Sequence, residues 1–311
     1  MLELNIDEVT TDLHTIADFL RWGVSRFNEA DLYYGHGSDN AWDEVVNLAL
    51  FALHLPGNMD NAIMQSRLTK TEKVEVINLI LRRIDERIPA AYLTNVAYFA
   101  GLPFYVDERV LVPRSPIGEL IENKFIDQIS SEPTRILDLC TGSGCIAIAC
   151  AYAFPEAEVD ALDLSEDALD VASLNIHNHE LNAQVIPIKS DVFSGVPGGK
   201  YDLIVTNPPY VDADDIGDMP DEFHHEPEMG LGCGDDGLDI VRTILAQSSE
   251  HLSENGVLIC EVGNSMLHVC AEYPEVDFTW IDFEHGGLGV FKLTQQQLLQ
   301  YKELFEQKAK K

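Results

Sequence analysis

The sequence lacks any long uninterrupted apolar run, and its most apolar stretch, residues 136–154, is broken by Asp138 and a glycine-rich turn. A membrane-spanning helix needs about 20 consecutive apolar residues, so no such helix is expected. The first residues are acidic and lack the basic and then apolar pattern of a signal peptide. These features predict a soluble, cytoplasmic protein.

Cysteine is scarce and is not arranged for metal binding. None of the six cysteines forms a C-x-x-C pair, and no histidine or cysteine spacing matches a zinc site. His224 and His225 are adjacent, and adjacent side chains rarely converge on one ion. We therefore expect reduced, mostly buried thiols and no metal.

Basic residues are also few, with 20 Lys and Arg against 53 Asp and Glu, which gives a formal charge of −33. Residues 195–294 hold 3 basic and 20 acidic residues, and residues 211–239 hold eleven acids without a Lys or Arg. Such a surface repels a nucleic-acid backbone and attracts a basic protein. A generally acidic, salt-adapted proteome would also explain part of the charge.

The first third of the sequence has the periodicity of helices. Apolar residues recur on one face over residues 7–28 and 39–55, and Thr69-x-x-Glu72 is a capping box at the start of a third helix. We predict an N-terminal helical domain over residues 1–95. Residues 96–106 read as two short strands about a turn, within a linker over 96–116, and a helix follows near 117–130.

From Arg135 onward, strands and helices alternate, which predicts a parallel sheet covered on both faces. The last two strands are joined by a connection too short for a parallel crossover, so they should pair antiparallel. Expected strands are 135–139, 158–163, 185–188, 201–206, 256–262, 277–283 and 289–293, and expected helices include 144–153, 166–182, 236–252 and 264–272. Over residues 117–311 this α/β arrangement resembles the Rossmann-like, seven-stranded class I methyltransferases that use S-adenosylmethionine (SAM).

A glycine-rich turn lies between the first strand and helix of this half. Its glycines permit a tight turn, and the helix N-terminus offers free N–H groups to a ligand. The turn also satisfies the looser dinucleotide pattern G-x-G-x-x-A, and Asp163 follows Gly144 at close to the spacing of a ribose-binding acid. An NAD enzyme is therefore a competing interpretation.

Acidic residues at three successive strand ends favour SAM over NAD. Asp138 would repel a pyrophosphate but suits the α-ammonium group of SAM. Asp163 suits the ribose, and Asp191 with Val192 suits the adenine, although Asp163 could instead cap a helix and Asp191 could be a turn residue. The predicted cofactor-binding residues are Asp138, Cys140, Thr141, Gly142, Ser143, Gly144, Asp163, Asp191, Val192 and Asn207.

The sequence Asn207-Pro208-Pro209-Tyr210 ends the fourth strand, because two prolines cannot continue a ladder. Open α/β sheets bind ligands at this end of their strands. The Asn207 side-chain oxygen and the Pro208 carbonyl can each accept one hydrogen of an amide, and Tyr210 can stack on its plane. We predict Asn207, Pro208, Pro209 and Tyr210 as the catalytic residues.

This motif resembles that of methyltransferases acting on planar nitrogen, and nearly the whole chain resembles the bacterial protein-(glutamine-N5) methyltransferases. The resemblance rests on residues 20–27, 34–37, 110–120, 140–149, 207–212, 225–228 and 259–265. It implies that SAM is converted to S-adenosylhomocysteine, and that the N-terminal domain contributes to recognition of a protein substrate.

Within that family, the sequence resembles the branch that modifies the basic large-subunit ribosomal protein L-three, either free or in an assembly intermediate. The branch acting on release factors usually has Gly at the position of Cys140, and its linker differs around Ser115. Methylation of release factors is the first alternative. A nucleic-acid adenine-N6 methyltransferase is the second, and the scarcity of basic residues near the motif argues against it.

Overall fold

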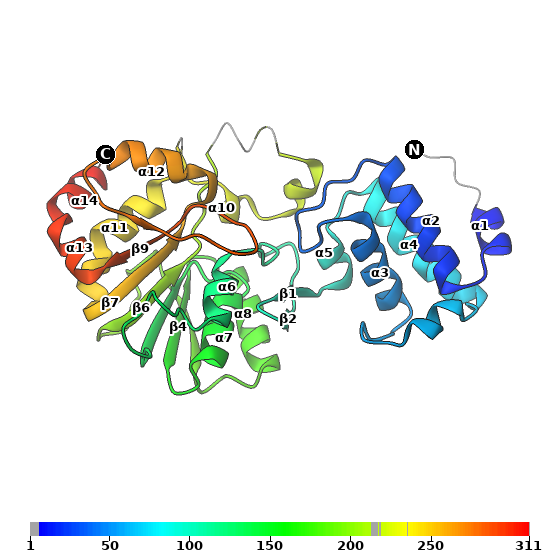
Figure 1. Cartoon of the computed structure of the whole chain (residues 1–311), viewed down its shortest axis with the longest axis horizontal. Helices are drawn as coiled ribbons and strands as arrows, with labels where there is room; N and C mark the ends of the chain where they lie inside the picture. The colour runs from blue at the N-terminus through cyan, green and yellow to red at the C-terminus, as the bar shows by residue number, and fades with distance from the viewer. Residues whose placement is uncertain (1–5, 213–216, 218, 235, 311) are drawn as a thin grey trace. The chain divides into compact units, whose positions relative to one another are not determined.

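The computed structural model describes residues 6–310 except 213–216, 218 and 235. It divides into two compact units (Figure 1). The helical unit comprises Met1–Val96 together with Pro220–His225, and the sheet unit comprises Ala97–Met219 and Glu226–Lys311. Each unit has its own apolar core.

The helical unit begins with two helices where the sequence predicts a single one over 7–28. Helix α1 spans Ile6–Asp12 and α2 spans Ile16–Glu29. Thr15 caps α2, because its side chain accepts from the Asp18 N–H while the Asp18 carboxylate accepts from the Thr15 N–H. The prediction of one helix is wrong because a capping box satisfies the free N–H groups of a new helix at that point.

The remaining helices of this unit are α3 Ala41–Ala52, η1 Asn61–Gln65, α4 Lys70–Asp85 and α5 Ala90–Thr94. The predicted capping box of Thr69 and Glu72 is confirmed. Helices α2, α3 and α4 pack around fully buried side chains such as Phe19, Leu48 and Ile80. The described part of the unit thus holds five α-helices, so the prediction of three was too low.

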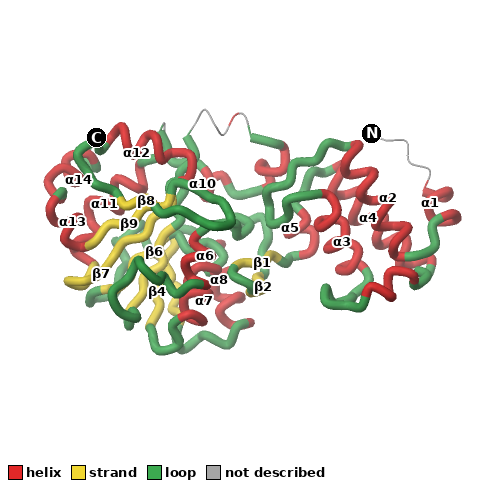
Figure 2. Tube along the Cα trace, in the orientation of Figure 1, coloured by secondary structure: helices red, strands yellow, loops and turns green. Residues whose placement is uncertain are grey.

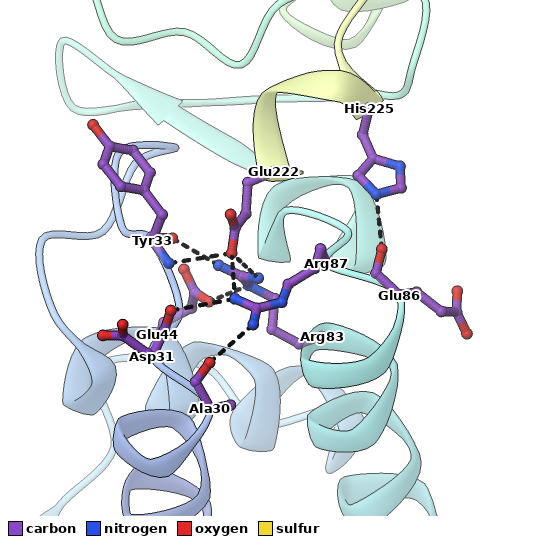
Figure 3. A network of polar contacts seen from close by, with 9 residues as sticks. All are labelled: Ala30, Asp31, Tyr33, Glu44, Arg83, Glu86, Arg87, Glu222 and His225. Carbon is purple, nitrogen blue, oxygen red and sulfur yellow. Dashed lines mark hydrogen bonds and ion pairs between the residues drawn. The ribbon is translucent and has the colours of Figure 1, made fainter. Parts of the chain in front are cut away.

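A short segment from the second half of the sequence completes the helical unit. Helix η2, Asp221–His225, places Glu222 where its Oε1 accepts from the Arg83 guanidinium at 3.0 Å and from the Tyr33 N–H at 3.2 Å (Figure 3). Arg83 also donates to Glu44 at 2.6 Å and to the Tyr33 carbonyl at 2.8 Å. Burial raises the pKa of Glu222, but hydrogen bonds from its own backbone and from Arg83 outweigh it, so its pKa lies below the usual value.

The sheet unit contains a seven-stranded sheet of order β5-β4-β3-β6-β7-β9-β8 (Figure 2). Strands β3 to β7 are parallel, and β9 is antiparallel to both of its neighbours, which confirms the predicted reversal of the last strand. The strands are β3 Arg135–Leu139, β4 Glu158–Asp163, β5 Val185–Lys189, β6 Tyr201–Thr206, β7 Leu252–Glu261, β8 Thr279–Trp280 and β9 Val290–Thr294. A separate hairpin pairs β1 Ala97–Phe99 with β2 Leu102–Phe104.

Helices cover both faces of this sheet (Figure 1). One core joins the sheet to α6 Ile117–Glu122, α7 Cys145–Ala153 and α8 Glu166–Asn178. The other joins it to α11 Asp239–His251, α12 Met266–Glu272, α13 Gln295–Gln300 and α14 Lys302–Lys308. Strands covered on both sides are nearly continuous apolar runs in the sequence, and these runs are the signal that identifies them.

Several boundaries differ from the prediction. Helix α6 ends at Glu122 rather than near 130, because Lys124, Phe125 and Asp127 have positive φ. Strand β7 begins at Leu252 rather than 256, and β8 holds only two residues. Among the described residues, no helix is long and apolar enough to cross a membrane.

Candidate functional site

The register of the parallel strands brings the predicted site residues to one edge of the sheet. Thr206 of β6 lies opposite Leu139 of β3 and Cys260 of β7, and Leu139 lies opposite Leu162 of β4. The residues that follow these positions are Cys140, Asp163, Asn207 and Glu261. Strand β3 sits between β4 and β6, so the chain order reverses here, and open α/β sheets bind ligands at such a point.

Asp138 organises the turn that follows β3. Its carboxylate is fully buried, and Oδ2 accepts from the Thr141 hydroxyl at 2.5 Å and from the Ala147 N–H at 3.1 Å. Oδ1 has no hydrogen-bond partner among the described residues. Burial raises the pKa of Asp138 to about 7. This acid ties the end of the strand to the first turn of α7.

The turn itself requires left-handed backbone at alternate residues. Cys140, Gly142 and Gly144 have φ of 59°, 54° and 80°. The conformation is easy for glycine but uncommon for cysteine, which shows how tightly the turn is constrained. Buried within it, the Cys140 thiol has a pKa well above its usual value, so it stays protonated.

Asp163 joins this turn to the end of β4. Its Oδ2 accepts from the Gly142 N–H at 2.9 Å, and its Oδ1 accepts from the Ser165 N–H at 2.9 Å. Burial raises the pKa of Asp163, and these backbone hydrogen bonds partly oppose the effect. The helix cap of α8 is Ser165 rather than Asp163. Each carboxylate oxygen keeps a second lone pair that can accept from a ligand hydroxyl.

The residues after β5 that were predicted to bind the cofactor, Asp191 and Val192, differ in how far they are exposed to solvent. The Asp191 side chain is exposed and makes no hydrogen bond within the described chain. Val192 is half-buried with a φ of 46°, and its carbonyl accepts from Ser190 at 2.7 Å. Phe193 is buried and stacks on His251, with ring centroids 4.5 Å apart, so it belongs to the core.

Asn207 follows β6 with an unpartnered acceptor. Its side-chain Oδ1 is shielded from solvent and has no hydrogen-bond partner among the described residues. Leaving a buried acceptor unpaired costs about 1–3 kcal/mol, and a bound ligand that donates a hydrogen bond to it would remove this cost. Pro208 and Pro209 are buried. Upstream, the Thr206 hydroxyl donates to the Leu139 carbonyl at 2.8 Å and fixes β6 to β3 where the motif begins.

Tyr210 is fixed by residues at the end of the neighbouring strand. Its hydroxyl donates to the Glu261 carboxylate at 2.9 Å, and its carbonyl accepts from the Ser265 hydroxyl at 2.7 Å. The second Glu261 oxygen accepts from the Ser115 hydroxyl at 2.5 Å. Burial and the Glu261 charge raise the pKa of Tyr210 well above its usual value, so the phenol remains a donor.

A second buried acid holds the segment before α6 in place. Glu226 accepts from the Val112 N–H at 2.9 Å and from both terminal nitrogens of Arg114 at 2.5 and 2.7 Å. A paired guanidinium fork of this kind is a strong and geometrically specific contact. The Arg114 charge lowers the pKa values of both Glu261 and Tyr210, although less than burial raises them.

Sequence reasoning did not assign roles to Arg114, Ser115, Glu226 or Glu261. All four lie in stretches on which the family resemblance rests, but no spacing links them, because they are distant in sequence. The hydrogen bonds that join Arg114 to Glu226 and Ser115 to Glu261 span 112 and 146 residues. The resemblance was therefore the only available signal.

The arrangement has the chemistry expected for SAM and for a planar amide. The acidic side chains of Asp163 and Asp191 provide acceptors for hydroxyl and amino groups. The turn, residues 140–144, contains no Lys or Arg to hold a phosphate. The unpartnered oxygens of Asp138 and Asn207 are acceptors that suit a cation or an amide hydrogen. The residues present fit SAM better than a dinucleotide.

Comparisons with known proteins show what this chain is similar to. Residues 122–225 match the family described as methyltransferase small domain. A ribosomal protein uL3 glutamine methyltransferase from Xanthomonas campestris pv. campestris is 52% identical over 290 residues, covering 93% of this chain and 94% of that protein.

A second relative with the same name, from Francisella tularensis subsp. tularensis, is 46% identical over 301 residues and covers 96% of each chain. Among solved structures, a methyltransferase from Pyrococcus furiosus is 21% identical with a TM-score of 0.45, covering 63% of this chain and 89% of that one.

Proposed function

Because the chain belongs to the family of ribosomal protein uL3 glutamine methyltransferases, we propose that it methylates the side-chain amide nitrogen of a glutamine in uL3 (ribosomal protein L-three). The methyl donor is SAM, and the product is S-adenosylhomocysteine. The names of the relatives favour uL3 over a release factor or a nucleic acid as the substrate.

The unpartnered Asn207 oxygen carries this proposal. An amide nitrogen is a poor nucleophile because its lone pair is delocalised into the carbonyl. The Asn207 oxygen and the Pro208 carbonyl each accept one hydrogen of the glutamine NH₂, which orients the nitrogen and favours the positive charge that develops on it. The fixed φ of proline keeps the second acceptor in place.

The other residues orient the reactants. The Tyr210 ring covers the amide plane, and the proton leaves to water after transfer. When bound, SAM supplies a methyl group activated by its sulfonium. The Gly142–Gly144 turn, Asp163 and Asp191 would hold the cofactor. Orienting reactants in this way accounts for up to about 7–11 kcal/mol of a barrier.

The helical unit and the acidic character of the chain serve substrate recognition in this proposal. The predicted domain 1–95 binds the protein substrate, and the linker 96–116 joins it to the methyltransferase domain 117–311. The charge of −33 attracts a basic ribosomal protein in the cytoplasm, where ribosomes are assembled.

The proposal is tested by incubating the enzyme and radiolabelled SAM with purified uL3, with release factor and with whole ribosomal extract. Mass spectrometry of the labelled band should find a single methyl group on a uL3 glutamine. Asn207→Ala should lower kcat by about 100-fold or more while leaving the SAM Kd nearly unchanged. Asn58→Ala, at an exposed turn, is the matched control. Label in RNA or release factor instead of uL3 would refute the assignment.

A further inference from the structure

Tyr210 is held at three points by one short segment, Glu261–Ser265. Glu261 accepts from its hydroxyl, and Ser265 donates to its carbonyl. Gly263 lies against its ring, since a Cβ placed on Gly263 would come within 2.5 Å of the Tyr210 Cε2 atom. The segment begins at the last residue of β7, and β7 pairs with β6, the strand that leads into the motif.

Glu261 is the unusual member of this segment. It is only 4% exposed, and burying a carboxylate is costly unless it is paired or hydrogen-bonded. Its Oε1 accepts a hydrogen bond from the Tyr210 hydroxyl, and its Oε2 accepts one from the Ser115 hydroxyl. Arg114, beside Ser115, supplies a nearby positive charge. Because this buried acid accepts hydrogen bonds from hydroxyls of two distant segments, it fixes the relative positions of those segments.

The backbone around Gly263 shows that the ring position is closely constrained. Gly263 has a φ of 45°, and a Cβ on Gly289 would come within 2.1 Å of the Gly263 carbonyl oxygen. Because Gly263 and Gly289 have no side chains, the segment after β7 can contact both the residue before β9 and the Tyr210 ring. A ring packed this closely on one side can serve as a flat surface on the other.

We propose that Glu261 is a positioning residue for methyl transfer, which fixes the Tyr210 hydroxyl so that the ring holds the glutamine amide in its reactive orientation. This inference rests on the proposed function. Without the acceptor, the hydroxyl end of the tyrosine ring is no longer fixed, and the amide plane loses part of its support. A displacement of about 1 Å of a reacting group is enough to slow a reaction about 100-fold.

A double-mutant cycle tests the proposal. Glu261→Gln keeps the shape but leaves one oxygen acceptor for two hydroxyls, and Tyr210→Phe keeps the ring but removes the donor. Each should lower kcat about 10-fold while changing the SAM Kd, measured by calorimetry, by less than about 2-fold. The double variant should be no slower than the slower single variant, because both remove the same bond.

Glu254→Gln is the matched control, since Glu254 is exposed near the other end of β7. Ser115→Ala should cost less activity than Glu261→Gln, because the Tyr210 bond remains. Melting temperatures separate a loss of folding from a loss of positioning. A kcat of Glu261→Gln equal to that of the wild type, losses that multiply in the double variant, or a weakened SAM Kd would each overturn the role.

Two of the variants already described keep the test decisive. If Glu261→Gln does not fold, Tyr210→Phe measures the same bond from its other end, and wild-type turnover would refute the proposal. Asn207→Ala separates this inference from the proposed function. If Asn207→Ala transfers methyl groups at the wild-type rate, the amide-binding function itself is contradicted. If Asn207→Ala loses methyl transfer while Glu261→Gln stays fully active, only the positioning role is contradicted.

Discussion

The Nη1 atom of Arg83 lies 3.0 Å from the Oε1 atom of Glu222, although 139 residues separate the two in the sequence (Figure 3). Both side chains are almost fully buried, at 1% and 2% exposed. Through this contact the segment 220–225, only ten residues beyond Tyr210, belongs to the helical unit. The acids Asp214, Asp215, Asp218 and Asp235 of the same acidic stretch lie outside the described residues.

Removal of Glu222 should destabilise the helical unit. Glu222→Ala leaves Arg83 with only Glu44 as a charged partner, and breaking a buried pair costs about 3–5 kcal/mol. Urea unfolding is followed by tryptophan fluorescence, to which Trp22 and Trp42 of this unit contribute together with Trp280 of the sheet unit. Glu228→Ala, at an exposed acid of the same stretch, should change the midpoint little. Equal midpoints for the two variants would show that the ion cluster adds no stability.

Stability should fall as the pH rises through the titration of Asp138. Its pKa is about 7 in the folded chain against 3.8 for an ordinary aspartate, so folding takes up a proton between these values. The free energy of unfolding should therefore decrease from about pH 4 to about pH 7 and level off above it, by a few kcal/mol in total at about 1.4 kcal/mol per pKa unit.

The comparison with Asp138→Asn isolates this effect, because the amide keeps an acceptor for Thr141 but does not ionise. Urea unfolding of both proteins without SAM at pH 5 and pH 8 should show the variant gaining stability relative to the wild type at the higher pH. Parallel pH profiles would place the Asp138 pKa near its ordinary value.

Asp163→Ala should weaken SAM binding. The substitution removes the ligand acceptor and also leaves the Gly142 N–H without its partner, so the turn loses its link to β4. We expect the SAM Kd to rise at least about 10-fold, since hydrogen bonds to charged groups contribute about 1.5–3 kcal/mol each. Asp167→Ala, in the exposed first turn of α8, is the calorimetric control. An unchanged Kd would assign Asp163 to turn structure alone.

Salt should slow the capture of uL3 without affecting the chemical step. Screening shortens the reach of exposed charges from about 10 Å at 0.1 M salt to about 3 Å at 1 M. We expect kcat/KM for uL3 to fall several-fold between these conditions while kcat stays constant. Glu222 and Glu226 are buried and paired with arginines, so only exposed acids such as Glu228 contribute to attraction. Glu228→Lys should reduce the salt dependence, and indifference to salt would exclude steering.

The prediction from sequence succeeded where the signal is local. Strands 135–139, 158–163 and 201–206 were predicted with the observed bounds, because buried parallel strands are continuous apolar runs. It failed for 7–28 and 117–130, where a capping box and a run of positive φ values end helices within a favourable periodicity. Local capping and turn geometry outweighed the pattern there.

The sequence by itself determined the parallel sheet with its reversed last strand, the glycine-rich turn and the Asn207–Tyr210 motif, because each depends on neighbouring residues. Only the tertiary structure decided that Glu261 accepts hydrogen bonds from both Tyr210 and Ser115, and that Glu222 belongs to the helical unit. Strand register and packing bring together side chains more than fifty residues apart, as for Tyr210 and Glu261 at 51 residues, and no short-range pattern encodes those meetings.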